Sequence, residues 1–333
     1  MCSVGVRKIG GSIVTELEEY LIKNNTMLKA RERIPLECTW KYASKEYGNP
    51  IRLMSLPCLE ISYKWCIEYI NILLQNNVVS IGIDELKIDD KNLSFLKNLS
   101  FLKELRLRGL SYGKENYNFE GLKYLRNLEV LYLLSSQSAQ SINFSMLKKL
   151  QICSIDFALD KGNKTLFECK NLEELYVYGY LDKEFSFSQL TKLNILTIQT
   201  KSLITLEGIE NLKRLTDLTI INSRKIKDFE QLCKLQSIKR LNLQYFRADN
   251  LIETISQLEN LEFLYLANVG KIESIASLEN CKNLKEIFIA YGTTVIEDGD
   301  LSVLFKLPKL EKVLIETKKH YSHSNEELHA YIG

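Results

Sequence analysis

The sequence has few of the side chains on which enzymes and metal sites depend. Histidine occurs three times in 333 residues, and the first of the three is His320. No two cysteines form a CxxC pair, and neither a glycine-rich phosphate loop nor a G-x-S-x-G turn occurs. A catalytic cysteine needs a histidine base close to it in the fold. These absences argue against an enzyme, and we expect no catalytic residues, no cofactor and no metal.

Long hydrophobic runs and an excess of charge of one sign are also missing. No run reaches the eighteen apolar residues of a membrane-spanning helix, and the N-terminus lacks the hydrophobic stretch of a secretory signal. The 44 basic and 42 acidic residues leave a net charge of +2, a poor basis for general nucleic-acid binding. We therefore expect a cytoplasmic protein with eight reduced cysteines and with neither a membrane nor a nucleic acid as partner.

A repeated pattern dominates the rest of the chain. The unit is L-x-x-L-x-L, with other apolar residues allowed at each slot, and it occurs eleven times at intervals of 21 to 26 residues. The eleven units are Val78/Ile81/Ile83, Leu102/Leu105/Leu107, Leu128/Leu131/Leu133, Leu150/Cys153/Ile155, Leu172/Leu175/Val177, Leu193/Leu196/Ile198, Leu215/Leu218/Ile220, Ile238/Leu241/Leu243, Leu261/Leu264/Leu266, Leu284/Ile287/Ile289 and Leu310/Val313/Ile315.

The spacing within each unit predicts a short strand followed by a helical turn. In L-x-L, period two points both apolar side chains to one face of a strand. Upstream, apolar residues recur every third position, as at Leu301, Leu304 and Leu307, which suits a short 3-10 or helical segment. Since no unit can bury its apolar face alone, neighbours must stack and their strands must form one parallel sheet. The pattern predicts a right-handed α/β solenoid.

The units resemble the leucine-rich repeat family, and closely its short 22-residue class, typified by bacterial internalin-like repeats. Residues 218–238, LTIINSRKIKDFEQLCKLQSI, show the form most plainly, and the resemblance covers about 78–315. It implies a curved sheet on the concave side and short helical or 3-10 segments on the convex side. The asparagine expected after L-x-L is mostly missing. Asn222 and Asn268 are offset candidates, and Tyr180 and Thr200 stand in comparable places, so irregular loops and uneven curvature should follow.

Residues 1–77 differ from the repeats and are expected to form an N-terminal α+β cap for the solenoid at 78–317. The alternative is a separate effector domain. A capping box at Thr15 and Glu18 predicts a helix. Further elements are expected as a strand at 34–42, a turn at 47–50, a weaker strand near 51–56, and a helix at 63–75 with Trp65, Tyr69, Ile72 and Leu73 on one face.

Residues 318–333 are expected to form a C-terminal cap or tail. Ser324 and Glu327 have the spacing of a capping box, which predicts a last helix. His320 and His323 with Glu327 are the only metal-ligand set worth weighing, and their spacing matches no known site. We interpret these histidines as part of a solvated tail.

The residues that flank and separate the L-x-L positions should point onto the concave face, the usual docking surface of a solenoid. Aromatic residues rimmed by charge occur there in two groups, as in protein interfaces. The alternative is that these aromatics only stack along the sheet and stabilise it. The candidate partner-binding residues are Arg106, Arg108, Tyr132, Glu174, Tyr176, Tyr178, Asp217, Arg240, Tyr245, Phe263, Tyr265, Phe288 and Tyr291. The longer loops at 109–118 and 291–300 should project from the repeat edge, either as contact sites or as tolerated length variation.

The sequence thus predicts a non-enzymatic interaction scaffold that binds a partner protein on its concave, aromatic-rich face. A cytosolic inhibitor, an adaptor or an immunity-type protein that masks a toxin would each fit. The Lys-, Asn- and Ile-rich composition hints at a bacterial source of low GC content. The alternative is a recruitment arm for an enzyme or effector whose activity resides in residues 1–77.

Overall fold

The computed structural model divides the chain into two units, residues 1–59 and 60–333. The residues that it describes are 59–60, 63–68, 70–75, 78–84, 88–108, 117, 119–133, 142–156, 163–180, 182–226, 229–247, 249–290 and 292–332. The expected helix after Thr15, the strand at 34–42 and the elements at 47–56 lie outside the described residues. The limits 1–77, 78–317 and 318–333 therefore stay predictions, and the fold below is that of the second unit.

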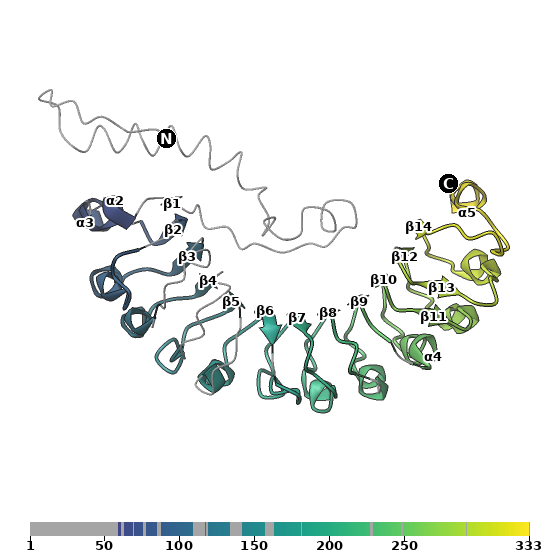
Figure 1. Cartoon of the computed structure of the whole chain (residues 1–333), viewed down its shortest axis with the longest axis horizontal. Helices are drawn as coiled ribbons and strands as arrows, with labels where there is room; N and C mark the ends of the chain where they lie inside the picture. Colours follow the sequence, from purple (N-terminus) through teal and green to yellow (C-terminus); the bar gives the residue numbers. More distant parts are fainter. Residues whose placement is uncertain are drawn as a thin grey trace, which may run out of the picture. The chain divides into compact units, whose positions relative to one another are not determined.

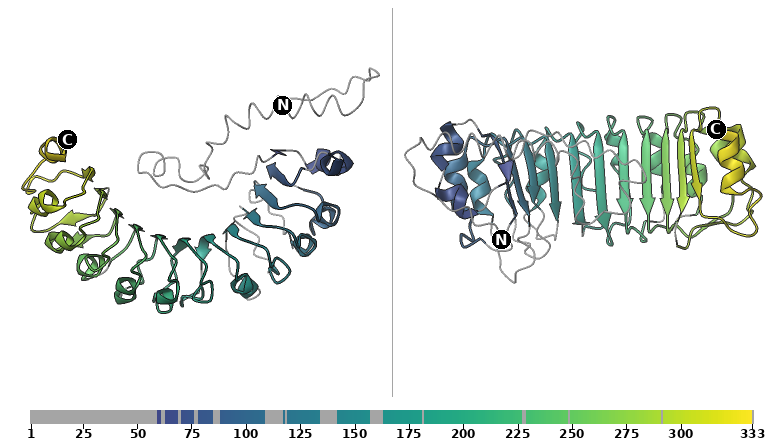
Figure 2. Two further views of the ribbon diagram at one scale, coloured as in Figure 1. Left: turned by 180° about the vertical axis from the view of Figure 1, so that it is seen from behind. Right: turned by 90° about the horizontal axis from the view of Figure 1, so that it is seen from above.

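The second unit is built on one parallel sheet, in which every predicted L-x-L unit forms a strand. Neighbouring strands follow chain order and pair in register, so that Leu241, Leu264 and Ile287 lie side by side. The strands line the inner side of the arc in Figure 1 and run parallel in the right-hand view of Figure 2. They are β2 (Ser80–Asp84), β3 (Glu104–Arg108), β4 (Val130–Leu133), β5 (Ile152–Asp156), β6 (Glu174–Tyr180), β7 (Ile195–Thr200), β8 (Asp217–Ile221), β9 (Arg240–Gln244), β10 (Phe263–Ala267), β12 (Glu286–Ala290) and β14 (Lys312–Ile315); β1 (Leu59–Glu60) spans the unit boundary.

Short helical segments cover the outer side of the arc, as the period-three pattern predicts (Figure 1). Most of them are 3-10 helices of three to six residues, because an apolar residue at every third position keeps one face of such a turn inward. They are η1 (Ser94–Leu99), η2 (Glu120–Tyr124), η3 (Asn163–Glu168), η4 (Ile209–Asn211), η5 (Glu230–Lys234), α4 (Leu251–Ile255), η6 (Ala276–Asn280) and η7 (Ser302–Lys306).

The core lies between the sheet and these segments. Leu241 and Leu243 of β9 are fully buried, and so is Leu258 in the turn that follows α4. Cysteines 153, 169 and 281 take leucine slots and are buried as small hydrophobic side chains. Each fully buried aliphatic side chain stabilises the fold by about 1.5–3 kcal/mol before the entropy of ordering the chain is subtracted.

The residue that follows several strands adopts a left-handed backbone conformation. Asn222, Tyr245 and Asn268 occupy this position after β8, β9 and β10, with φ of 62°, 54° and 54°. Asparagine tolerates this conformation well, which explains the two offset asparagines. At the end of β7, Thr200 donates from Oγ1 to the carbonyl of Tyr180 at 2.7 Å, and so forms the inter-repeat bond for which an asparagine was expected.

Four units carry an asparagine directly before their first leucine, and we had predicted no role for these residues. Each donates from Nδ2 to a backbone carbonyl of the preceding repeat, at 2.8 Å from Asn171 to Lys148 and 2.9 Å from Asn283 to Glu259. The same bond joins Asn127 to Ser100 and Asn260 to Gln236. The signal was visible as N-L-x-x-L at three of these units and as N-L-x-x-I at the fourth. These bonds form a ladder between repeats. It runs along the N-terminal ends of the strands, opposite to the C-terminal ends, where the repeat consensus places its asparagine.

The register of the sheet shifts between Val177 and Tyr180, where β6 pairs with β7. Gly179 lies within the shift and has a φ of 71°, a conformation that a side chain would disfavour. This is the irregularity that departures from the repeat consensus led us to expect. The expected projection of 291–300 is wrong for the part that is described: β13 (Val295–Ile296) pairs with β11 (Lys271–Ile272), because the added residues form a second small parallel sheet.

The described ends of the second unit are helical. The helix expected at 63–75 is present as α2 (Tyr63–Glu68) and α3 (Ile70–Gln75), with Leu73 fully buried. At the C-terminus the predicted capping box is confirmed at the start of α5 (Asn325–Ile332). The backbone N–H of Ser324 donates to Glu327 at 2.8 Å, and the N–H of Glu327 donates to Ser324 Oγ at 3.2 Å. Helix α5 packs on β14 and η7 and buries Leu328.

Candidate binding surface

The concave face carries the side chains that alternate with the buried L-x-L residues. In the central slot of successive strands stand Arg106, Tyr132, Ser154, Tyr176, Thr197, Thr219, Asn242, Tyr265, Phe288 and Leu314. Glu174, Asp217, Arg240 and Phe263 begin their strands and point to the same side, while Tyr178 lies within β6 and Tyr245 follows the end of β9. The side chain of Arg108 and all of Tyr291 lie outside the described residues.

The first aromatic cluster spans β3 to β6. The Arg106 guanidinium lies 5.1 Å from the centroid of the Tyr132 ring, and its Nε is paired with Glu104. Glu104 is fully buried and accepts a second bond from Ser80 Oγ at 2.8 Å. Two strands on, the Tyr176 hydroxyl donates to its neighbour Glu174 at 2.9 Å. Two buried carboxylates thus fix the orientation of the charged and phenolic groups on this half of the face.

Burial determines the pKa values of Tyr132 and Tyr176. Desolvation raises the pKa of Tyr132 and of Tyr176 far above the ordinary tyrosine range, and the Glu174 charge raises that of Tyr176 further. Both phenols are therefore neutral near neutral pH.

The second aromatic cluster spans β9 to β12. The Arg240 guanidinium lies 4.1 Å from the centroid of the Phe263 ring and pairs with Asp217 at 3.4 Å on the other side. The Phe288 ring lies 5.5 Å from Phe263 and 6.4 Å from Tyr265, both at tilted angles. Burial raises the pKa of Tyr265 to about 12. The cluster is a continuous layer of rings with one guanidinium at its edge.

The expectation that these aromatics are exposed is wrong. Tyr132, Tyr176, Phe263 and Tyr265 are 2–4% exposed, and Phe288 is 6% exposed. Strands in a sheet lie about 4.8 Å apart, so Tyr265 and Phe288, which occupy adjacent central slots, cover one another. A partner at this face meets ring edges, hydroxyl groups and guanidinium groups. Tyr245 differs from the others, because 38% of its side chain is exposed.

A polar strip separates the two clusters. Thr197 and Thr219 occupy adjacent central slots in β7 and β8, and Asn242 follows in β9. Asn242 accepts a bond of 3.0 Å from Gln244 Nε2. The small side chains of the strip make it the place where a bulky substitution would protrude furthest from the sheet.

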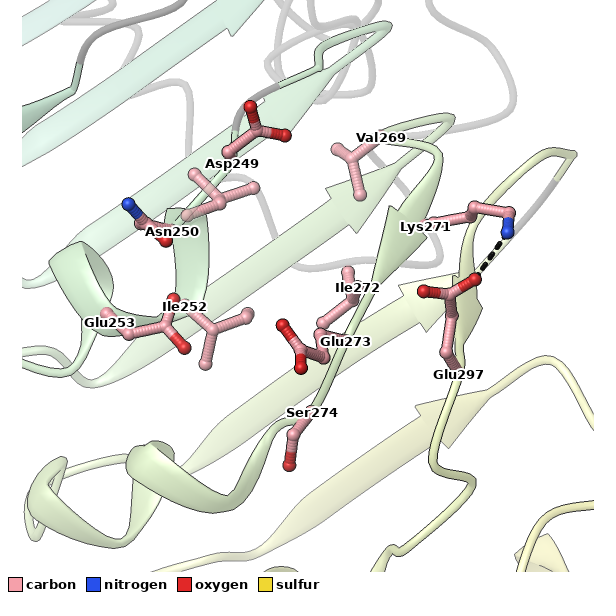
Figure 3. A pocket seen from close by; sticks show the side chains of 11 residues that line it. Asp249, Asn250, Ile252, Glu253, Val269, Lys271, Ile272, Glu273, Ser274 and Glu297 are labelled. Atoms are coloured by element: carbon pink, nitrogen blue, oxygen red, sulfur yellow. Dashed lines mark hydrogen bonds and ion pairs between the residues drawn. The ribbon is translucent and has the colours of Figure 1, made fainter.

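The sequence analysis missed a hollow at the edge of the sheet where the strands end (Figure 3). It has a volume of about 390 Å³ and lies between α4, β11 and the loop after β13. Asp249, Glu253, Glu273 and Glu297 line it, together with Lys271, which pairs with Glu297. Its lining therefore carries more negative than positive charge, and we call it the acidic hollow. These carboxylates come from three consecutive repeats, so no short motif could reveal their proximity.

Comparison with solved structures agrees with this geometry. An internalin from Listeria monocytogenes superposes with a TM-score of 0.57 at 18% identity, over 76% of this chain and 71% of the internalin. A leucine-rich repeat protein from Leptospira interrogans gives a TM-score of 0.50 at 16% identity, over 78% of each chain. The chain has the leucine-rich repeat fold. At such identities the likeness shows the fold alone, while the sequence matches no protein-family model and none of the curated proteins compared with it.

The thiols buried in this leucine-rich repeat unit are unsuited to nucleophilic chemistry. Burial raises the pKa of Cys169 and Cys281 to about 11 and that of Cys66 to about 12. The nucleophilic form of cysteine is the thiolate, which these side chains do not populate near neutral pH. Among the described residues, no group of three or more His, Cys, Asp or Glu could hold a metal ion, and no helix is long and apolar enough to cross a membrane.

Proposed function

We propose that this leucine-rich repeat protein is a non-enzymatic scaffold that binds a partner protein on its concave face. The observation that carries the proposal is the preorganised order of that face, where both aromatic clusters are held by ion pairs and hydrogen bonds. A rigid surface loses little conformational entropy when it docks, so more of the contact energy appears as affinity.

The proposed contact surface consists of the aromatic clusters, their charged groups and the polar strip. The buried rings keep the surface rigid and Tyr245 supplies exposed aromatic area, while Arg106, Glu174, Asp217 and Arg240 set which partner charges are accepted. Arg108, Tyr178, Tyr245 and Tyr291 complete the surface at the strand ends. We place this activity in the cytoplasm, with a role as inhibitor, adaptor or immunity-type protein.

The test adds bulk to the polar strip without removing any buried ring. Thr197→Arg with Thr219→Arg places two long side chains in central slots, a position that Arg106 already occupies in β3. The matched control is Gln189→Arg, at an exposed site in the turn before β7. Affinity capture from a lysate of the source organism, followed by mass spectrometry, compares the two variants with the unaltered protein.

The proposal expects one stoichiometric partner to be captured by the unaltered protein and by Gln189→Arg, and to be lost from the double-arginine variant. Equal capture by all three proteins would show that the concave face is not the contact surface. Melting temperatures of the three proteins establish that any loss of capture is not a loss of folding.

A further inference from the structure

A strongly basic patch lies on the edge of the sheet where the strands end, outside the concave face. Lys201 follows β7 directly, Arg224 and Lys225 follow β8, and Arg247 follows β9, and all four side chains are exposed. Because the strands are parallel and in register, the four cations lie along the same edge. We call these four residues together with Tyr245 the basic edge.

Tyr245 is held on the basic edge in an unfavourable backbone conformation. Its φ is 54°, whereas the equivalent positions in the flanking repeats hold Asn222 and Asn268, which tolerate that conformation. The Arg224 guanidinium lies 5.9 Å from the centroid of its ring. Because Tyr245 is 38% exposed, burial of its ring does not offset the free-energy cost of the left-handed backbone conformation. A strained residue with an exposed aromatic side chain points to a role outside folding.

Within the described residues, the cations of the basic edge have no acidic partners. None of Lys201, Arg224, Lys225 and Arg247 forms an ion pair with a carboxylate in the described part of the chain. On the other flank of the same repeats, by contrast, Lys239 pairs with Glu262. Arg224 and Arg247 stand three residues after the paired strand ends Ile221 and Gln244, so they occupy equivalent positions in adjacent repeats.

The acidic hollow bounds the basic edge. Asp249 stands two residues after Arg247, Glu253 lies in the same repeat, and Glu273 continues the negative charge into the next one (Figure 3). A nucleic acid needs an extended basic track for its phosphates, and one that followed the edge would meet this hollow and be repelled. A short acidic peptide segment fits within the basic edge.

We propose that the basic edge binds an acidic segment of a partner protein, with carboxylates on Arg224 and Arg247 and a side chain against the Tyr245 ring. This site adjoins the concave surface and shares only Tyr245 with it, and its four cations lie outside that surface, so the inference holds whether or not the concave face binds a protein. The charge on the edge would also speed the encounter with an acidic partner.

The experiment measures binding of a fluorescein-labelled peptide of ten glutamates to the full chain by fluorescence anisotropy, in about 150 mM salt. Arg224→Ala with Arg247→Ala should weaken binding by about tenfold or more. Tyr245→Asn, which installs the residue of the flanking repeats, should weaken binding by about threefold at an unchanged melting temperature. The matched control is Lys213→Ala with Arg214→Ala, two exposed cations in the turn before β8, which should leave the affinity unchanged.

Two outcomes would overturn the inference. One is an equal affinity of the peptide for the unaltered protein and the Arg224/Arg247 variant, or no measurable binding to either. The other is tighter binding of a ten-nucleotide oligothymidylate than of the peptide, which would assign the edge to nucleic acid. The double-arginine variant of the polar strip should bind the peptide normally, so failure of the basic edge and failure of the concave face are separate results.

Discussion

The guanidinium of Arg240 lies over the ring of Phe263, 4.1 Å from its centroid, while Asp217 pairs with it from the neighbouring strand. Burial lowers the pKa of Arg240, and the Asp217 charge opposes that shift, so the guanidinium keeps its charge on a largely dry surface. The relationship shows how three adjacent repeats combine into a single contact unit, which no repeat could form alone.

Removal of an aromatic ring from the concave face should destabilise the protein. Phe288→Ala is expected to lower the free energy of unfolding by about 3 kcal/mol, because the ring is 6% exposed and contacts Phe263 and Tyr265. Tyr245→Asn is the control and should change it by less than about 0.5 kcal/mol. Urea denaturation followed by circular dichroism measures both. A Phe288 variant as stable as the control would mean that the aromatic layer contributes little to the fold.

The asparagine ladder should contribute stability of its own. Asn283→Ala is expected to cost about 1 kcal/mol, since Asn283 donates to the Glu259 carbonyl at 2.9 Å and accepts from Lys309 at 2.6 Å. Asn280→Ala, at an exposed site in η6 three residues earlier, is the matched control and should be neutral. Thermal melting of both variants provides the comparison. If the two substitutions lower the stability equally, the hydrogen bonds of Asn283 contribute no more to stability than bonds to water would, and the prediction is wrong.

Acid should weaken one inter-repeat bridge in a predictable direction. The hydrogen bond from Lys285, at 2.7 Å, holds the pKa of Glu262 below its ordinary value of 4.5, and Lys239 adds to the effect. A lowered carboxylate pKa in the folded state contributes stability above the unfolded value, and this contribution is lost as the pH falls through the folded value. The contribution is small, because the Glu262 side chain is partly exposed and screened by solvent.

Glu262→Gln should therefore reduce stability slightly at pH 7 and flatten the loss of stability below about pH 4.5. Denaturation of the variant and the unaltered protein across this range tests the claim. Glu259→Gln is the control, since Glu259 is exposed and engages Asn283 only through its backbone carbonyl. An identical pH profile for the Glu262 variant and the unaltered protein would contradict the assignment.

The repeat spacing determined most of the fold. The L-x-L positions determined the strand placement and register, the period-three leucines determined the 3-10 segments, and Ser324 with Glu327 determined the start of the last helix. Each of these features is local, because it follows from which side chains one short segment must turn toward the core.

Tertiary structure alone decided which side chains of the surfaces are buried and which charges lie close together. The aromatics at Tyr176, Tyr265 and Phe288 were placed on the correct face, but their burial depends on side chains of adjacent strands, which lie more than twenty residues away in the chain. The acidic hollow and the basic edge likewise assemble residues from consecutive repeats. Stacking of the repeats brings strand ends that are far apart in the chain close together in space. This proximity determines which charges are paired and which remain exposed, and the sequence does not display it.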